Sequence, residues 1–196
     1  MSLFSDAQVT FLLCDYAAND AAGKLNVIGA GVTFLNLVAG PGTPTPPFTL
    51  VAQVNVPASH ADKQYALTVE LFDVTRGQIV NMPADDPGQL QALRAQQVVT
   101  VGRPMLPPGL QQPDNPMMGN TMMMAFPQGL PLQENTAYEW RVQIDGQTRH
   151  WFYRFHVLGP QPGVIIGGPA NPSRIPGIGE YVVDRPSAEE PPATDV

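Results

Sequence analysis

Apolar and polar side chains alternate along residues 136–158, the most regular stretch of the sequence. A period of two places one set on each face of a β-strand, so the pattern predicts two strands that are each apolar on one side. Asp145-Gly146 lies between them and suits the positive φ angles of a tight hairpin turn. We therefore predict a hairpin that anchors the core, with these residues pointing inward: Tyr138, Trp140, Val142, Ile144, Trp151, Tyr153, Phe155 and Val157.

Shorter apolar runs recur along the chain between turn-forming residues. They cover residues 8–16, 24–37, 48–56, 64–74, 79–80, 97–102 and 120–127. Seven or eight strands separated by turns predict an all-β fold, an antiparallel two-sheet β-sandwich. The segment 130–138 adds an immunoglobulin-like feature, because it places a turn and then the inward Tyr138 before a strand, as at the corner preceding strand F of those domains.

One segment, residues 86–94, has the features of a helix instead. Asp86 can cap it and Pro87 fits its first turn, while Leu90 and Leu93 would face inward. A loop with transient helical structure is the alternative. We predict this as the one helix of the fold.

The composition divides the chain into three parts. Residues 1–158 form the predicted sandwich domain, which long proline-rich loops at 40–47 and 103–119 interrupt. Residues 159–185 are rich in proline but contain two small apolar patches, so we predict an extended arm that docks on its own domain or on a neighbour. Residues 186–196 are predicted to be a disordered acidic tail.

The formal net charge of −7, with only two lysines, argues against nucleic-acid binding, which needs basic residues to neutralise phosphates. The single cysteine, Cys14, lies in an apolar run and is expected to be a buried small hydrophobe. The N-terminal residues lack the pattern of a secretory signal, and no apolar run is long enough to span a bilayer. We expect a soluble protein made in the cytoplasm that binds neither nucleic acid nor membrane.

The sequence offers little for catalysis or metal binding. His150 and His156 share a strand face but lie about 20 Å apart at the rise of a strand, and His60 lies in a loop where exposure is expected. Asp85 and Asp86 are adjacent loop acids, which are usually solvated. We therefore expect no enzyme, no metal site and no cofactor.

Several apolar residues are candidates for a protein interface. Three consecutive methionines on one strand must place at least one side chain on each face, and two phenylalanines are expected on the outer faces of their strands. The arm patches are further candidates. The full set is Phe72, Met122, Met123, Met124, Phe152, Val164, Ile165, Ile166, Ile175, Ile178 and Tyr181.

Four short motifs support a family resemblance: CDYA at 14–17, GKLNVIGAG at 23–31, VGRP at 101–104, and GLPL at 129–132 followed by YEWRVQIDG at 138–146. Over residues 8–158 the chain resembles a family of small bacterial and phage-associated proteins known only as a domain of unknown function. The resemblance implies a sandwich fold and carries no catalytic residues.

Two functions follow as hypotheses, and a third, a hydrolase, would require His150 or His156 near an acid on the next strand. The first is a non-enzymatic protein that makes protein–protein contacts in a larger assembly, with self-association or a capsid surface as the partner, and specifically a phage virion accessory or capsid-decorating protein. The second is a β-sandwich that binds a carbohydrate or a peptide through exposed Trp140, Trp151 or His150. Under the first hypothesis, the protein is made in the cytoplasm and then becomes part of the virion.

Overall fold

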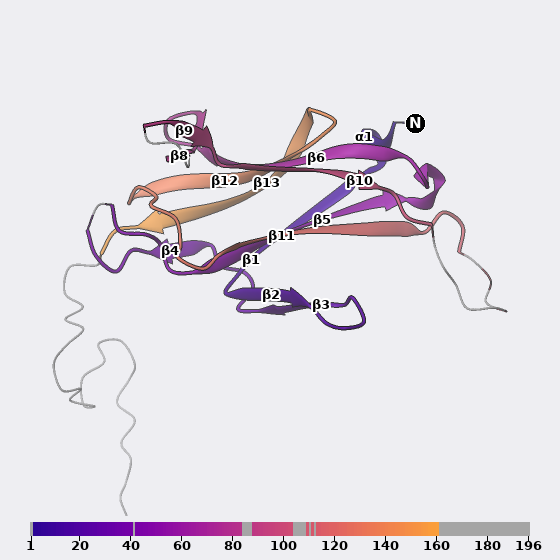
Figure 1. Ribbon diagram of the computed structural model, residues 1–196, viewed down its shortest axis with the longest axis horizontal. Helices are drawn as coiled ribbons and strands as arrows, with labels where there is room; N and C mark the ends of the chain where they lie inside the picture. Colours follow the sequence, from indigo (N-terminus) through magenta and orange to yellow (C-terminus); the bar gives the residue numbers. More distant parts are fainter. Residues whose placement is uncertain are drawn as a thin grey trace, which may run out of the picture. The chain divides into compact units, whose positions relative to one another are not determined.

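The computed structural model describes residues 2–40, 42–83, 88–103, 109, 111 and 113–160. Residues 1–161 form one compact unit, shown in Figure 1. The predictions for the acidic tail, for all of the arm beyond residue 160, and for Asp85 and Asp86 fall outside the described residues. No helix in the part of the chain described here is long and apolar enough to cross a membrane.

The described chain is mostly β, and two sheets form a sandwich. The smaller sheet has the order β1 (Gln8–Cys14), β5 (Phe48–Pro57), β11 (Met117–Phe126), and all its pairs are antiparallel. The larger sheet has the order β10 (Arg94–Thr100), β6 (Gln64–Asp73), β12 (Thr136–Ile144), β13 (Gln147–Leu158), β4 (Phe34–Asn36), and β7 (Gln78–Ile79) also pairs with β6. The β13–β4 pair is parallel, so the fold departs from the purely antiparallel prediction at one edge.

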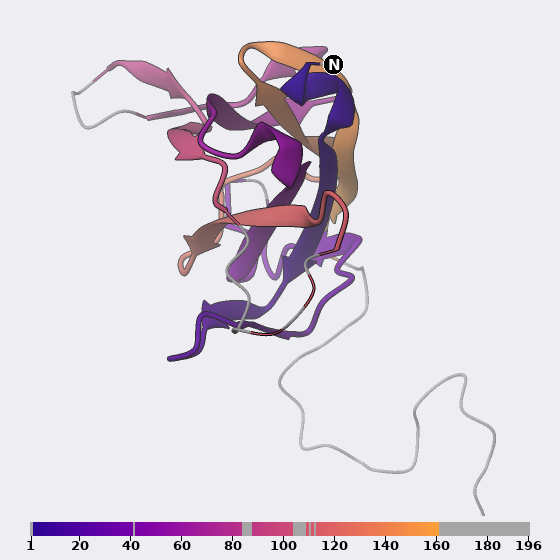
Figure 2. The same ribbon diagram turned by 90° about the vertical axis from the view of Figure 1, so that its right-hand side faces the viewer.

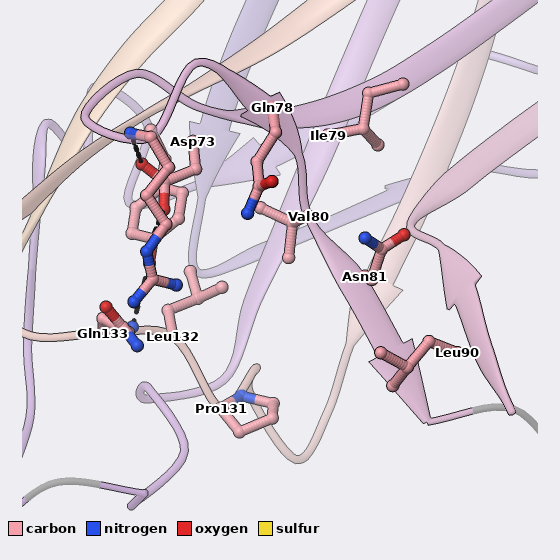
Figure 3. A pocket seen from close by; sticks show the side chains of 11 residues that line it. Asp73, Gln78, Ile79, Val80, Asn81, Leu90, Pro131, Leu132 and Gln133 are labelled. Atoms are coloured by element: carbon pink, nitrogen blue, oxygen red, sulfur yellow. Dashed lines mark hydrogen bonds and ion pairs between the residues drawn. The ribbon is translucent and has the colours of Figure 1, made fainter. Parts of the chain in front are cut away.

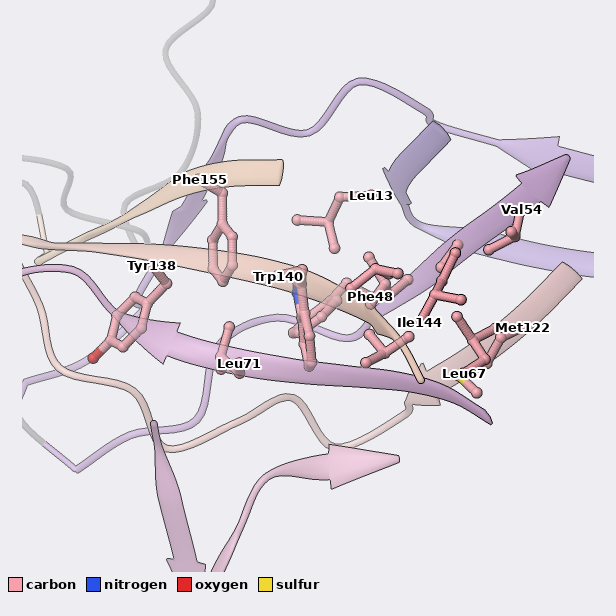
Figure 4. Packing of buried hydrophobic residues seen from close by; sticks show 14 of the residues in the cluster. Leu13, Phe48, Val54, Leu67, Leu71, Met122, Tyr138, Trp140, Ile144 and Phe155 are labelled. Carbon is pink, nitrogen blue, oxygen red and sulfur yellow. The ribbon is translucent and has the colours of Figure 1, made fainter. Parts of the chain in front are cut away.

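Apolar residues that alternate along the strands of both sheets meet in one core. Trp140 is fully buried between the sheets and stacks on Phe126 of the smaller sheet, with their ring centroids 5.6 Å apart. Figure 4 shows Trp140 among side chains from both sheets, including Phe48 and Leu71. The even-numbered residues of β5 and the odd-numbered residues of β6 supply most of the remainder, as the period of two requires.

A third layer covers part of the smaller sheet. The hairpin of β2 (Tyr16–Asn19) and β3 (Leu25–Ile28) lies beneath β1, β5 and β11 in Figure 1. Val51 and Cys14 point away from the central core yet are buried, so the cysteine prediction is confirmed. The predicted strand 24–37 is divided into β3 and β4, because Gly29 and Gly31 turn the chain through positive φ angles of 68° and 93°.

The β12–β13 hairpin confirms the prediction for residues 136–158. Asp145 and Gly146 both have positive φ angles, 50° and 74°, as a type I′ turn requires. Trp151 and Tyr153 pack against the core as predicted, but they are only half-buried. Trp151 packs edge-on against Phe4 of a short helix, α1 (Leu3–Asp6), which was not predicted from the sequence.

The predicted helix at 86–94 is also wrong. Residues 90–92 form strand β9 (Leu90–Ala92), which pairs with β8 (Asn81–Pro83), and Arg94 begins β10. Leu90, predicted to face inward, is 71% exposed, whereas Leu93 packs against the core. The backbone of Leu93 hydrogen-bonds to Val80 and Leu71, and these long-range bonds outweigh the local capping signals. Figure 2 shows the β8–β9 hairpin projecting from the edge of the larger sheet.

Candidate functional site: an arginine–phenylalanine face

The outer face of the larger sheet carries a compact set of arginines and phenylalanines above two buried carboxylates. The strand registers align Arg94, Glu70, Arg141 and Phe152 in one row across β10, β6, β12 and β13. The next row holds Phe72, Glu139 and Arg154. We call the exposed and half-exposed members of these rows (Phe72, Arg94, Arg141, Phe152 and Arg154) the arginine–phenylalanine face.

Glu139 is the centre of this face and is 3% exposed. Arg141 donates to one of its oxygens through Nε at 2.9 Å and Nη2 at 2.7 Å, and Arg154 donates to the other through Nε at 3.0 Å and Nη2 at 2.5 Å. Burial opposes ionisation of Glu139, but the hydrogen bonds from Arg154 and Arg141 outweigh burial and hold the pKa of Glu139 below its ordinary value. The carboxylate therefore stays charged at neutral pH and fixes both guanidinium groups.

Glu70 repeats the arrangement one row away. It is 5% exposed, and one carboxylate oxygen accepts from Arg94 Nε at 3.2 Å and Nη2 at 2.9 Å. Its other oxygen accepts from the Gln143 side-chain amide at 2.9 Å. Both oxygens of this buried carboxylate are thus satisfied, as burial of a charged group demands.

Two phenylalanines lie beside the arginines of these ion pairs. The Arg141 guanidinium carbon lies 3.4 Å from the centroid of the Phe72 ring, a close cation–π contact that half-buries the ring. Phe152 is 44% exposed, and the guanidinium carbon of Arg154 lies 5.7 Å from its ring centroid. At the far end of the sheet, Phe34 stacks on His156 and is 56% exposed.

The face has a positive local charge on an acidic chain. Among the outward-pointing residues of β6, β10, β12 and β13, as the structure describes them, the carboxylates are Glu70 and Glu139, and both are buried under their arginine partners. The arginine side chains remain 35–50% exposed. Solvent therefore meets guanidinium groups and aromatic rings held in fixed positions, a combination typical of protein-binding hot spots.

The predicted interface residues have different environments in the structure. Phe152 and Met123 are exposed, the latter by 36%, and Phe72 is half-buried under Arg141. Met122 is buried in the core, and Met124 is half-buried against it, so the methionine run divides between two faces as expected. Residues Val164, Ile165, Ile166, Ile175, Ile178 and Tyr181 lie outside the described residues.

The arginines and both glutamates of this face were not among the residues predicted from the sequence. The sequence did indicate that three of them share one surface, because Glu139, Arg141 and Arg154 alternate with core residues and therefore lie on the outer face of the hairpin. Their pairing depends on strand register, however, and the partners Glu70 and Arg94 come from strands far away in the sequence.

A pocket of 310 Å³ lies at one end of the larger sheet, close to the β6–β7 turn and the loop at 131–133. Figure 3 shows Gln78, Gln133 and Asn81 beside the aliphatic side chains of Val80 and Leu132. The carboxylate of Asp73, which lines the same pocket, is buried and accepts a hydrogen bond from the Arg76 backbone N–H at 2.9 Å. The pocket thus presents amide groups, the half-exposed Arg76 side chain and aliphatic surface, which suit a peptide segment.

The histidines show one clear departure from expectation. His60 is 3% exposed, not solvated, and its Nε2 lies 2.8 Å from the Asp6 carboxylate while Nδ1 lies 3.1 Å from Lys63 Nζ. The hydrogen bond with His60 holds the pKa of Asp6 below its usual value. Within the described residues, no group of three histidine, cysteine, aspartate or glutamate side chains could hold a metal ion.

The fold and the face define a β-sandwich domain with an ordered outer surface. A family model described as a family of unknown function, DUF6941, matches residues 9–157, which is most of the chain. The chain belongs to the DUF6941 family. No curated protein matches it.

Proposed function

We propose that the domain is a non-enzymatic interaction module that docks an acidic protein surface on its arginine–phenylalanine face. The observation that carries this proposal is the pair of buried glutamates, which fix three half-exposed arginines beside two phenylalanine rings. Arginine and aromatic residues contribute most to binding at protein interfaces, and side chains fixed beforehand lose less entropy on binding. The exposed charges of the face are all positive, so the partner is acidic.

The first test is capture of a partner from cell extract with the full-length protein and with Phe152→Asp. This substitution would place a carboxylate beside Arg154 and oppose an acidic surface. The matched control is Leu90→Asp, because Leu90 is also an exposed apolar side chain, 71% accessible, but lies on the β8–β9 hairpin. A protein captured by wild type and Leu90→Asp but lost with Phe152→Asp supports the proposal.

Hydrogen exchange of the captured complex then locates the contact. The proposal predicts slower exchange in the strands that carry the face, β6, β10, β12 and β13, when the partner is bound. Protection confined to the strands of the smaller sheet, or equal capture by all three proteins, contradicts it.

The sandwich is proposed to be of the immunoglobulin type. Its two sheets have the orders β1-β5-β11 and β10-β6-β12-β13, which correspond to strands A-B-E and C′-C-F-G of immunoglobulin domains. Tyr138, near the start of the strand equivalent to F, accepts a hydrogen bond from the Gln133 backbone N–H at 2.9 Å, as in a tyrosine corner.

We further propose that the assembly served by this module is a phage particle, with the protein as an accessory or capsid-decorating subunit made in the cytoplasm. The resemblance to phage-associated proteins supports this version. Identification of the captured acidic partner tests it, because a virion structural protein is the expected result and a metabolic enzyme would exclude it.

A second candidate function is peptide binding in the 310 Å³ pocket. Its amide-bearing and aliphatic lining favours a peptide over a carbohydrate, since Trp140 is fully buried and Tyr138, the aromatic residue among those lining the pocket, is 2% exposed. A thermal-shift screen with a short peptide library tests it. A peptide that raises Tm for wild type but not for Gln78→Ala supports the pocket, and no shift with any peptide removes this candidate.

A further inference from the structure

Strand β11 borders the smaller sheet and has an unpaired edge in the described part of the structure (Figure 1). The backbone N–H of Ala58 donates to the carbonyl of Pro116, so these two residues form a hydrogen-bonded pair in the register of β5 and β11. This pair determines which residues of β11 hydrogen-bond to β5. Hydrogen-bonded pairs alternate along an antiparallel ladder, so even-numbered residues of β11 bond to β5 and odd-numbered residues direct their N–H and C=O groups away from it. The free groups belong to Met117, Gly119, Thr121, Met123 and Ala125.

This edge lacks the usual protection against strand addition. The ten residues of β11, MMGNTMMMAF, include no charged residue and no proline. The other edges differ. The edge of β1 is partly occupied, because the Leu13 carbonyl accepts hydrogen bonds from the backbone N–H groups of Gly31 and Val32. The edge of β13 is covered by β4. The edge strand β10 is shorter than β11 and carries the charged Arg94. Among the described strands, β11 is therefore the longest edge open to another strand.

We propose that β11 pairs antiparallel with β11 of a second copy of this chain. The register that uses every free backbone group places Met117 opposite Ala125, Gly119 opposite Met123, and Thr121 opposite its own copy on the twofold axis. Each exposed methionine, Met117 at 41% and Met123 at 36%, then lies across from a small residue. The uncharged strand adds no like-charge repulsion, and a threonine pair is favourable across strands.

The resulting dimer joins two smaller sheets into one continuous sheet. The arginine–phenylalanine face lies on the other sheet and is not used in this contact. Each dimer therefore presents two such faces, and a partner that repeats in an array would bind both with increased avidity. Self-pairing does not depend on the proposed binding of an acidic partner.

Cysteine cross-linking of the full-length protein tests this register. Thr121→Cys places two thiols on the axis, where opposite Cα atoms of a hydrogen-bonded pair lie about 5.5 Å apart, within disulfide range. Met117→Cys is the matched control, because its two copies would lie about 27 Å apart along the paired strands. The native Cys14 is buried and does not compete. Covalent dimers are expected on air oxidation with Thr121→Cys and not with Met117→Cys.

Backbone substitution supplies an independent test. Thr121→Pro removes only a free N–H, so the domain is expected to fold and to elute as a monomer, whereas Thr121→Ala keeps the N–H and remains a dimer. Light scattering at about 100 μM protein, a concentration suited to a small interface, gives the mass.

A monomeric wild-type protein, or equal cross-linking at both cysteine positions, overturns the pairing. Phe152→Asp is expected to remain dimeric, so failure of the proposed partner binding is distinguished from failure of self-pairing.

Discussion

Glu139 connects the stability of the domain with the geometry of the arginine–phenylalanine face. It is buried on the outer side of a sheet, where a strand normally exposes its polar residues, and four N–H donors from two arginines surround it. Without these donors, a carboxylate at this depth would incur a large desolvation cost. The ion pairs therefore keep the charge buried and fix the guanidinium groups that we propose as partner contacts.

The lowered pKa of Glu139 predicts acid sensitivity. Because the folded-state pKa lies below the unfolded value, which is near 4.5, ionised Glu139 stabilises the fold above that value, and this stabilisation is lost as pH falls through the folded pKa. Glu139→Gln is expected to lower the free energy of unfolding by about 2 kcal/mol at pH 7.

Urea unfolding from pH 7 downward measures this effect. The difference between wild type and Glu139→Gln is expected to shrink as the pH falls below 4.5. Glu134→Gln is the control, because the contacts described for Glu134 include no arginine, and it should show no such trend. A difference that stays constant with pH would contradict the role assigned to the ion pairs.

At the scale of elements, the loops at the end of the sandwich are tied to each other by backbone contacts. The Thr45 backbone N–H donates to the Leu130 carbonyl at 2.9 Å, and the Leu130 N–H donates to Thr45 Oγ1 at 3.0 Å. Gly129 allows this approach, because a Cβ there would lie 1.8 Å from the Thr45 carbonyl oxygen. The contact holds the turn that leads into β12.

Two glycine substitutions separate backbone conformation from crowding. Gly129 and Gly146 have similar positive φ angles, 67° and 74°, but a Cβ at Gly146 meets no atom within 4 Å. Gly146→Ala is expected to cost about 1 kcal/mol from its φ angle alone. Gly129→Ala is expected to cost at least about 3 kcal/mol, because backbone must also move. Thermal unfolding measures both, and equal losses would contradict the role of the Thr45 contact.

Strand faces could be predicted from the sequence where alternation was long, as in the β12–β13 hairpin and in β5 and β6. The helix prediction failed at 86–94 because Asp86 and Pro87 are local signals, whereas Leu93 bonds to residues on other strands. The alternation of apolar and polar residues correctly placed Phe152 on an outer face. It could not predict that Phe72 is half-buried, because the Arg141 side chain that packs on its ring belongs to a neighbouring strand. His60 was misjudged for a similar reason, since its partner Asp6 lies 54 residues away.

At the scale of the whole molecule, the two sheets carry different surfaces. The larger sheet presents the arginine–phenylalanine face, and the smaller sheet ends in the open edge of β11. The proposed division is that one surface binds an acidic partner and the other joins two copies. A chain with a net charge of −7 would otherwise repel an acidic surface, so the proposed binding of an acidic partner depends on the local arrangement of arginines.

Binding through the arginine–phenylalanine face is tested most directly by the Kd of the captured partner, measured by calorimetry for wild type, Phe152→Asp and Leu90→Asp. We expect a Kd for Phe152→Asp that is weaker by about thirtyfold, the loss typical of a hot-spot residue, and an unchanged Kd for Leu90→Asp. Equal Kd values for wild type and Phe152→Asp, with both proteins folded, would show that this face does not bind the partner.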